Sequence, residues 1–266
     1  MKLIESYPKN PIVSQFVDRY QLYDIDEPSF IKSVPNGKIE AWIINKGECR
    51  IWNHEKGEFS ESKENSFFPA TNEAAFFQIP ENLTCLNIKF NLSALTHEFF
   101  RDFSLRWESL SILDLLGSSG YEAIKRLSFV EGDSINSNFL DEILKNVFHE
   151  GVEDPIVLQI IDLLETHAPN SSSTWLADRL SMSTKTLERV MKKYFALSPK
   201  DLLSIFRFGQ ATTHLNKDRS QKFIDALAFG YYDQSHFVKQ CRKLTGYTPK
   251  DFFSKLRLPT TDVIFE

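Results

Sequence analysis

The chain has 266 residues, of which 42% are hydrophobic and 25% charged, which is the balance of a soluble globular protein. This length is enough for two domains that each bury a core. The three cysteines, Cys49, Cys85 and Cys241, are widely spaced without a CxxC pair, which argues against a disulfide framework and a thiolate metal site. No N-terminal apolar segment approaches the ~20 residues of a membrane span, and the core of a signal peptide is absent. We therefore expect a cytoplasmic protein.

The net charge of −5 is divided unevenly along the chain. Residues 171–266 hold 16 Lys and Arg against 9 Asp and Glu, a net charge of +7, whereas residues 1–170 hold 15 against 27, a net charge of −12. An acidic half joined to a basic half indicates a domain attached to a polyanion binder. Chance clustering of solvated charge is the alternative.

Residues 36–90 have the pattern of β-strands. The segment 38–45, KIEAWIIN, is apolar enough for a buried strand. The segment 84–90, TCLNIKF, alternates in polarity, which is the period of two of a strand with one covered face. Short loops such as NKGE and PENL separate these runs, so we expect a small antiparallel barrel or sandwich.

From about residue 92 the hydrophobic period becomes helical. In residues 138–151 the apolar side chains recur at i, i+3, i+4, i+7 and i+8, which predicts an amphipathic helix that ends at Gly151. These side chains are Leu140, Ile143, Leu144, Val147 and Phe148. Such a stripe usually belongs to a core, but it could equally form the seam of a homodimer.

Six aromatic residues of the β-rich region could line a pocket for an apolar or sugar-like small-molecule effector. They are Trp42, Trp52, Phe67, Phe68, Phe76 and Phe77. The alternative, that they are plain core, is the commoner use of aromatic side chains at such positions. The sequence does not decide between the two.

The best candidate for a domain boundary lies between Gly151 and Pro155. Pro155 suits the first turn of a new helix. We therefore expect a β-rich sensor or dimerisation domain with C-terminal helices over residues 1–151, followed by an all-α domain over residues 152–266. The whole chain is then an α+β protein.

The second domain begins with a helix-turn-helix pattern. The segment HAPNSSS provides a serine cap for a short helix over residues 174–180. Ser181 and Met182 then form a tight turn, and Ser183 caps a helix over Thr184–Phe195. The order helix, turn, helix is the one that this motif requires. We expect the motif over about residues 173–196.

A similar unit recurs 50 residues further on, since STKTLERVMKKYFALSPKDLL starts at Ser183 and DQSHFVKQCRKLTGYTPKDFF at Asp233. In the second copy Ser220 is expected to cap a helix over residues 221–229, Asp233 to cap the next helix, and Gly246 to end it. We expect this motif over about residues 220–246, with a linker helix over about residues 199–216 between the motifs.

Both copies of the repeat end in Ser/Thr-Pro, but they differ at the residue expected to end the helix. Thr248 and Pro249 suit a helix start, because Thr caps and Pro is tolerated in the first turn. Ala196 occupies the position of Gly246 in the first copy. Because a left-handed alanine costs about 1 to 2 kcal/mol, we expect the first helix to end in a different geometry.

Two helix-turn-helix motifs joined by a long helix, the second reading AFGYYDQSHFVKQCRKLTGYTPKDF, resemble the AraC/XylS family of bacterial transcription regulators over about residues 154–257. The residues that carry this resemblance are Ala177, Ser183, Leu187, Arg189, Ser198, Pro199, Ala226, Gly230, Gln234, Ser235, Phe237, Gly246 and Pro249. The chain departs from the family at Met191 and Cys241, where Phe is usual, and at Ala196. More weakly, FVDRYQLY, VPNGKIEAWIIN and LNIKFNLSAL resemble the sensor domains attached to this unit.

The resemblance implies that double-stranded DNA is the partner. RNA polymerase, a small-molecule effector and a second copy in a homodimer could be further partners. The exposed face of each recognition helix would read bases, with residues Lys185, Thr186, Glu188 and Arg189 in the first motif and Gln234, Ser235, His236 and Lys239 in the second. Thr184, Lys192, Lys193, Arg242 and Lys243 would contact phosphates.

Simpler readings exist for several of these residues. Glu188 could form an ordinary ion pair with Lys192 at i,i+4. Gln234 could contact a phosphate instead of adenine. His236 has no second His or Cys at ligand spacing, so it would face DNA or solvent instead of a metal. The basic residues could form a solvated face.

Two other classes of protein remain as alternatives. An enzyme could lie in the N-terminal barrel, with the second domain as a targeting module, but GxGxxG, P-loop, GxSxG and HExxH motifs are all absent. An architectural protein that binds DNA without sequence preference would need more positive charge. We expect no catalytic residue, cofactor or metal.

Overall fold

The structure is a computed structural model that describes residues 2–53, 56–61, 65–100, 103, 110–127, 135–148, 154–168, 171–217, 223–256 and 260–265. The chain forms two compact units. Unit 1 consists of residues 1–30, 38–69 and 77–154, and unit 2 of residues 31–37, 70–76 and 155–266. The predicted boundary at residues 151 and 152 lies outside the described residues.

The β-rich part consists of antiparallel strands. One sheet, wholly in unit 1, has the order β1-β2-β9-β4-β7 and contains Lys2–Ser6, Val17–Ile25, Leu83–Phe90, Ile39–Gly47 and Phe67–Phe68. The other has the order β10-β3-β8-β5-β6 and contains Val263–Phe265, Ser29–Ser33, Ala75–Ile79, Arg50–Asn53 and Glu58–Glu61. The boundary between the units falls within β3 and β8. The α+β class is thus confirmed, with two sheets and no closed barrel among the described strands.

The predicted single covered face of residues 84–90 is wrong, because both faces of β9 are buried. Lys89 Nζ lies 3.1 Å from Glu40 Oε1 of β4. Asn87 Nδ2 donates to Glu40 Oε2 at 2.9 Å, and Trp42 Nε1 donates to the same oxygen at 3.2 Å. A buried carboxylate is tolerated when it is paired and hydrogen-bonded. The alternation in polarity therefore marks a buried polar cluster instead of a solvated face.

The helices of unit 1 are short or follow the strands. They are α1 Val13–Phe16, the 3-10 helices η1 Leu92–Thr96 and η2 Glu98–Phe100, α3 Ile112–Leu127 and α4 Ser137–Phe148. The predicted stripe of α4 is confirmed, with Leu140, Leu144 and Phe148 buried. Asp141 of α4 accepts hydrogen bonds from the backbone N–H groups of Lys9 and Asn10. The predicted helix end at Gly151 lies outside the described residues.

The aromatic side chains of unit 1 contact one another. Trp42 stacks on Phe77 at 5.5 Å between ring centroids, and Phe68 meets Phe77 edge-on at 5.5 Å. Phe67 packs on Phe90 and Phe100. Such ring pairs add about 0.5 to 1.5 kcal/mol to simple burial. These contacts are those of a hydrophobic core.

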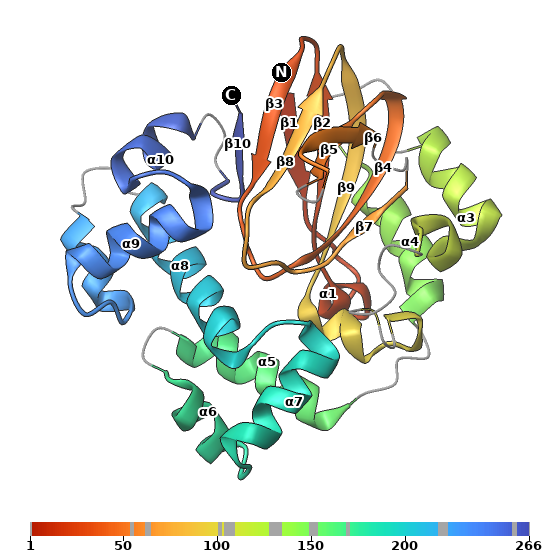
Figure 1. The fold of residues 1–266 in the computed structure, drawn as a ribbon. Coiled ribbons are helices and arrows are strands. Elements are labelled where there is room, and N and C mark those ends of the chain that lie inside the picture. The colour runs from red at the N-terminus through yellow and green to blue at the C-terminus, as the bar shows by residue number, and fades with distance from the viewer. Residues whose placement is uncertain are drawn as a thin grey trace. The chain divides into compact units, whose positions relative to one another are not determined.

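Unit 2 is mostly helical and is arranged around α8. Its helices are α5 Pro155–His167, α6 Ser173–Arg179, α7 Thr184–Phe195, α8 Pro199–Lys217, the 3-10 helix η5 Phe223–Phe229, α9 Gln234–Thr245 and α10 Pro249–Lys255. The long helix α8 contacts α5, α6, α7, η5 and α9 (Figure 1). Its Phe208 ring lies 6.2 Å from Phe237 of α9 and 5.9 Å from Phe252 of α10.

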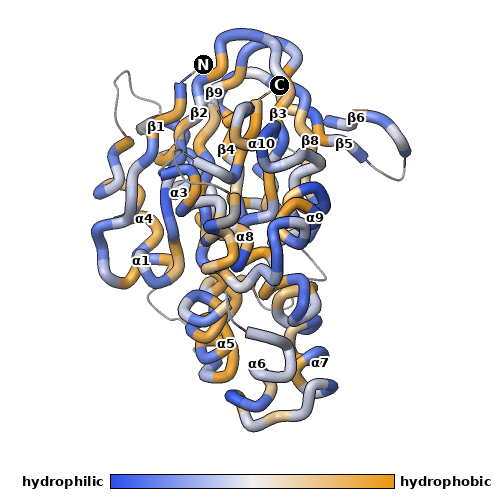
Figure 2. The backbone as a smooth tube through the Cα atoms, turned by 90° about the vertical axis from the view of Figure 1, so that its left-hand side faces the viewer, coloured by the Kyte–Doolittle hydropathy of each residue, from blue (hydrophilic) through white to orange (hydrophobic). Residues whose placement is uncertain are grey.

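Local sequence signals set the helix ends in unit 2. Ser172, Ser183, Asp233 and Thr248 each accept a backbone N–H from the first turn of α6, α7, α9 and α10, respectively, as N-caps do. Each of these predicted caps is confirmed. The tube in Figure 2 is mostly hydrophobic along α5 and alternates along α7 and α9, as expected when one face of a helix is buried.

The ends of α7 and α9 are more alike than predicted. Gly246 has φ 79° and ends α9 in the left-handed region, as predicted. Ala196 has φ 57° and ends α7 in the same region, so the prediction of a different geometry is wrong. The surrounding helices hold this alanine in a conformation that it does not prefer. The predicted cap Ser220 lies outside the described residues.

Unit 2 also contains β-structure, although the sequence predicted an all-α domain. Strand β10, Val263–Phe265, pairs antiparallel with Ile31–Ser33 of β3. A run of three apolar residues is too short to identify as a strand from its pattern. Its partner lies some 230 residues away in the chain, so only the tertiary structure reveals the pairing. None of the described helices is both long and apolar enough to cross a membrane.

Candidate DNA interface

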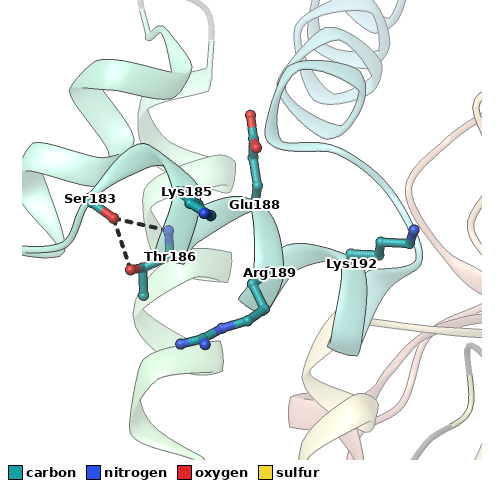
Figure 3. A pocket seen from close by; sticks show the side chains of 6 residues that line it. All are labelled: Ser183, Lys185, Thr186, Glu188, Arg189 and Lys192. Carbon is teal, nitrogen blue, oxygen red and sulfur yellow. Dashed lines mark hydrogen bonds between the residues drawn. The ribbon is translucent and has the colours of Figure 1, made fainter.

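Helix α7 presents a polar face that begins at its N-cap. Leu187, Met191 and Phe195 are buried against the rest of unit 2. Lys185, Glu188 and Arg189 are exposed on the opposite side. With Ser183, Thr186 and Lys192 they line an open depression of about 480 Å³ (Figure 3). The four base-reading candidates of the first motif therefore share one surface.

The hydrogen bonds on this surface involve the cap. Thr186 donates its backbone N–H to Ser183 Oγ at 3.1 Å, and the two hydroxyl oxygens lie 2.9 Å apart. In contrast, no ion pair joins Glu188 to Lys192 in the part of the chain that the structure describes, and Figure 3 shows the two side chains pointing apart. The i,i+4 pair is thus not formed, which leaves the Glu188 carboxylate available to accept a hydrogen bond.

The phosphate candidates of the first motif are exposed. Thr184 lies in the first turn of α7, and Lys192 and Lys193 lie in the last. The Lys193 ammonium lies 4.7 Å from the centre of the Tyr194 ring, a cation–π contact that restrains its side chain. Lys192 is the less restrained of the two lysines.

Helix α9 presents Gln234, Ser235 and Lys239 in exposed positions, while Phe237 is buried. His236 differs from these residues because it is half-buried and held by protein contacts. Its Nδ1 accepts the backbone N–H of Tyr232 at 3.4 Å, and its ring meets the Tyr231 ring edge-on at 5.2 Å. With Nδ1 as the acceptor, Nε2 is the ring nitrogen that can donate.

The two basic residues in the last turn of α9 differ in their surroundings. Arg242 and Lys243 are both exposed. Lys243 Nζ donates to Asp201 Oδ1 at 3.2 Å, which ties α9 to the first turn of α8. A phosphate would have to compete with this carboxylate for Lys243. Arg242 is therefore the better phosphate candidate.

Asp201 has further partners that affect its ionisation. Partial burial by itself would raise the pKa of Asp201, but hydrogen bonds from Ser198, Lys243 and Asn72 and the charge of Lys243 lower the pKa below its ordinary value. Burial also raises the pKa of the Cys241 thiol in α9 to about 12. Cys241 and Met191 are both 0% exposed, so these departures from the family pattern are packing positions.

Tyr232 is a candidate that the sequence analysis missed. Its side chain is 91% exposed, and it directly precedes Asp233, the N-cap of α9. A large aromatic side chain is seldom so exposed without a partner. The YY dipeptide before the cap was visible in the sequence, but only the structure separates buried Tyr231 from exposed Tyr232.

No group of three or more His, Cys, Asp or Glu side chains is placed to hold a metal ion within the described ranges. The chemistry of the surface is therefore that of hydrogen-bond donors, acceptors and positive charge. Two capped helices of twelve residues each carry it, each following a shorter helix and separated by α8. This arrangement defines the class of the protein, an α+β protein with a double helix-turn-helix unit.

Comparison with known proteins agrees with this class. Residues 176–255 match the helix-turn-helix domain family. The chain therefore carries an AraC-type helix-turn-helix domain at its C-terminal end, and the resemblance to AraC/XylS regulators is confirmed.

Curated relatives match a similar share of the chain. The HTH-type transcriptional activator RhaS of Escherichia fergusonii is 31% identical over 111 residues, which cover 40% of this chain and 40% of that protein. RhaS of Pectobacterium carotovorum is 33% identical over 75 residues, or 28% of this chain and 27% of that protein. The chain thus matches less than half of the length of these relatives.

Solved structures extend the likeness to the whole fold. An apo ToxT variant from Vibrio cholerae superposes with a TM-score of 0.55 at 10% identity over 94% of this chain and 99% of that chain. Another ToxT crystal structure gives a TM-score of 0.52 at 12% identity over 88% of this chain and 97% of that chain. At such low identity the likeness shows the shared fold alone.

Proposed function

We propose that this protein is a sequence-specific DNA-binding transcription regulator that reads two successive major grooves. The observation that carries the proposal is the pair of capped helices, α7 and α9, which have equal length and different exposed side chains. The match to the helix-turn-helix domain and the net charge of +7 over residues 171–266 support it.

The exposed side chains of α7 have the chemistry of base readers. Lys185 and Arg189 can donate to guanine O6 and N7, and Arg189 can do so with two parallel hydrogen bonds. The unpaired carboxylate of Glu188 can accept from cytosine N4. Thr186 uses its hydroxyl at the cap, so its methyl group is the part that would meet a thymine methyl. We therefore assign the sequence preference of the first groove to these four residues.

The exposed side chains of α9 would read a different sequence. Gln234 can form two hydrogen bonds with adenine N6 and N7. Ser235 can donate or accept, and Lys239 would favour guanine. His236, whose Nδ1 accepts from Tyr232, would donate from Nε2. Since the two helices differ at each of these positions, the proposed operator is asymmetric instead of a direct repeat.

The phosphate contacts would set affinity and register. Thr184, Lys192, Lys193, Arg242 and Lys243 lie beside the base-reading positions on the two helices. Contacts of this kind add affinity without sequence information and weaken as salt rises. Because Lys243 pairs with Asp201, we expect Lys243 to contribute less than Arg242.

We further propose that residues 152–266 bind DNA, with motifs over about 173–196 and 220–246 and a linker helix over about 199–216, and that residues 1–151 sense an effector or dimerise. Activation is the proposed direction of regulation, because the matched relatives are transcriptional activators. Contact with RNA polymerase, an unidentified small-molecule effector and a homodimer belong to the same proposal, as does a cytoplasmic location.

Selection of binding sites from random double-stranded DNA with the full chain tests the proposal directly. The expected product is one asymmetric sequence with two conserved blocks about one helical turn, or ~34 Å, apart. Hydroxyl-radical footprinting of that sequence should show two protected grooves per monomer on one face of the duplex. Recovery of no common sequence, or protection of a single groove per monomer, would contradict the proposal.

A further inference from the structure

Two short segments from the N-terminal half of the sequence belong to the same compact unit as the recognition helices. Residues 31–37 and 70–76 are part of unit 2. Ile31, Lys32 and Ser33 pair with Phe265, Ile264 and Val263 of β10, respectively, and Figure 1 shows these two strands side by side. The Val34 N–H extends the pairing by donating to Asp262 O at 2.7 Å. Lys32 therefore lies on β3, a strand that is paired with β10 within a five-stranded sheet.

The Lys32 side chain reaches the C-terminal end of α9. Its ammonium donates to the backbone carbonyl of Thr245, the last residue of α9, at 3.0 Å. The same ammonium lies 4.0 Å from the centre of the Tyr247 ring and 4.6 Å from that of Phe76. Lys32 is only 6% exposed. The Lys32 ammonium is thus enclosed where the second recognition helix ends, and Lys255 Nζ lies 5.1 Å from the centre of the same Tyr247 ring.

Physical chemistry explains why the charge lies there. The last carbonyl groups of a helix lack partners within the helix and carry about half a negative charge. The faces of aromatic rings also attract a cation, the more so when water is excluded. Because a buried charge without compensation is costly, these contacts favour one position of the C-terminal end of α9 relative to β3.

Gly246, the residue that ends α9, lies close to the Lys32 ammonium. A Cβ at this position would lie 3.2 Å from Lys32 Nζ, closer than most such contacts. Ala196 has the same left-handed conformation at the end of α7. An alanine at position 246 would therefore require the Lys32 ammonium to shift by a few tenths of an ångström.

The neighbouring segments also contact α8. Asn72 forms a hydrogen bond with the carboxylate of Asp201 at the start of α8. A Cβ at Gly37 would lie 2.9 Å from a ring carbon of Phe206, so this backbone packs directly on the middle of the helix. Residues 31–37 and 70–76 thus contact both α8 and the end of α9.

We propose that Lys32 is a positioning residue for DNA reading, which fixes the C-terminal end of α9 and thereby sets how Gln234, Ser235 and Lys239 meet the second groove. The inference rests on the proposed function. A helix of twelve residues is a stiff rod about 18 Å long, so restraint at one end sets the orientation of the other. Lys32 itself does not contact DNA.

The first test measures DNA affinity of the full-length Lys32→Met variant. The probes are the selected operator and two versions in which either the α7 block or the α9 block is scrambled. In wild type, scrambling the α9 block lowers the DNA affinity. In the variant, this decrease in affinity should be about tenfold smaller, while the decrease caused by scrambling the α7 block stays unchanged. Lys32→Arg should restore most of the α9 discrimination, since it keeps the charge. Lys46→Met, at an exposed lysine, is the matched control.

A second measurement needs no DNA. Amide hydrogen exchange in the last turn of α9, residues 242–246, should be faster in Lys32→Met than in wild type, with α7 unchanged. If Lys32→Met reduces the discrimination at the α7 block and at the α9 block equally, Lys32 does not act through α9. Unchanged amide exchange in α9 would overturn the proposal as well. If wild type selects no DNA sequence, the proposed function fails, and the exchange rates still decide whether Lys32 holds α9.

Discussion

At the scale of single residues, Arg189 and Lys192 lie on one exposed surface but are expected to contact different parts of the DNA. Both line the depression on α7, but Arg189 lies a turn closer to the N-cap, where side chains reach base edges. We expect Arg189→Ala to cost about 1 to 3 kcal/mol on the operator and to relax the preference at one base pair. Lys192→Ala should weaken specific and random DNA alike.

Competition binding on the operator, its single-base variants and random duplex would separate the two effects. A salt titration adds a second readout, because loss of one phosphate contact should reduce the slope of log affinity against log salt by about one. If both variants lose affinity equally on all sequences, Arg189 does not read a base.

Tyr232 provides a prediction that follows from exposure alone. Its ring stands free beside the N-terminus of α9, where it could pack against the sugar–phosphate backbone. We expect Tyr232→Ala to weaken operator binding about tenfold, equivalent to about 1.4 kcal/mol, and Tyr232→Phe to retain it. Tyr7→Ala is the control, since Tyr7 is 57% exposed but belongs to unit 1. Fluorescence anisotropy would measure the affinities, and an unchanged Tyr232→Ala affinity would remove Tyr232 from the interface.

At the scale of elements, the ends of α7 and α9 provide a matched pair of substitutions. Ala196 has φ 57° and Gly246 φ 79°. Ala196→Gly removes the strain of a left-handed alanine from the folded state. Glycine also raises the conformational entropy of the unfolded chain, which offsets part of this gain. We therefore expect a net stabilisation of about 0.5 to 1 kcal/mol. Gly246→Ala adds both backbone strain and a close approach to Lys32, and should destabilise by more than 1 kcal/mol. Urea unfolding monitored by circular dichroism would test both signs.

The junction of α8 and α9 predicts a pH dependence. Hydrogen bonds from Ser198, Lys243 and Asn72, together with the charge of Lys243, outweigh the effect of burial and lower the pKa of Asp201. A carboxyl with a lowered folded pKa stabilises the protein above its unfolded pKa of about 3.9 and loses this effect as pH falls through the folded value. Asp201→Asn should therefore destabilise at neutral pH by about 1 kcal/mol.

The difference in unfolding free energy between Asp201→Asn and wild type should disappear in acid. Unfolding curves from pH 7 to pH 2.5 would show it, with Asp162→Asn as the control because Asp162 is exposed in α5. A difference that stays constant over this range would mean that ionisation of Asp201 is not its cause.

At the scale of the whole molecule, the three cysteines report on the two units separately. Burial raises the pKa of the Cys49 thiol to about 12, that of Cys241 to about 12, and that of Cys85 well above its ordinary value. Labelling at pH 8 should therefore require opening of the fold. Operator DNA at 100 times its dissociation constant should slow labelling of Cys241, in unit 2, about 100-fold. Mass spectrometry would follow each thiol, with Cys49 and Cys85 of unit 1 as internal controls.

Much of unit 2 could be predicted because its signals are local. Ser183, Asp233, Gly246 and Thr248 each act on neighbours within a few residues, so the bounds of α7 and α9 follow from the sequence. The prediction for Ala196 failed because tertiary packing overrides a cost of 1 to 2 kcal/mol. In unit 1, the polarity of Asn87 and Lys89 suggested a solvated face, whereas Glu40 pairs with them in the interior.

The sequence by itself determined the α+β class, the double helix-turn-helix and the candidate reading residues, because caps, periodicity and a repeat are properties of neighbouring positions. Only the tertiary structure decided which candidates are paired, as Lys243 is with Asp201, and which tyrosine is exposed. It also placed residues 31–37 in unit 2 and Lys32 at the end of α9. The contact between Lys32 and Thr245 joins positions 213 residues apart, and no local pattern encodes such a pairing.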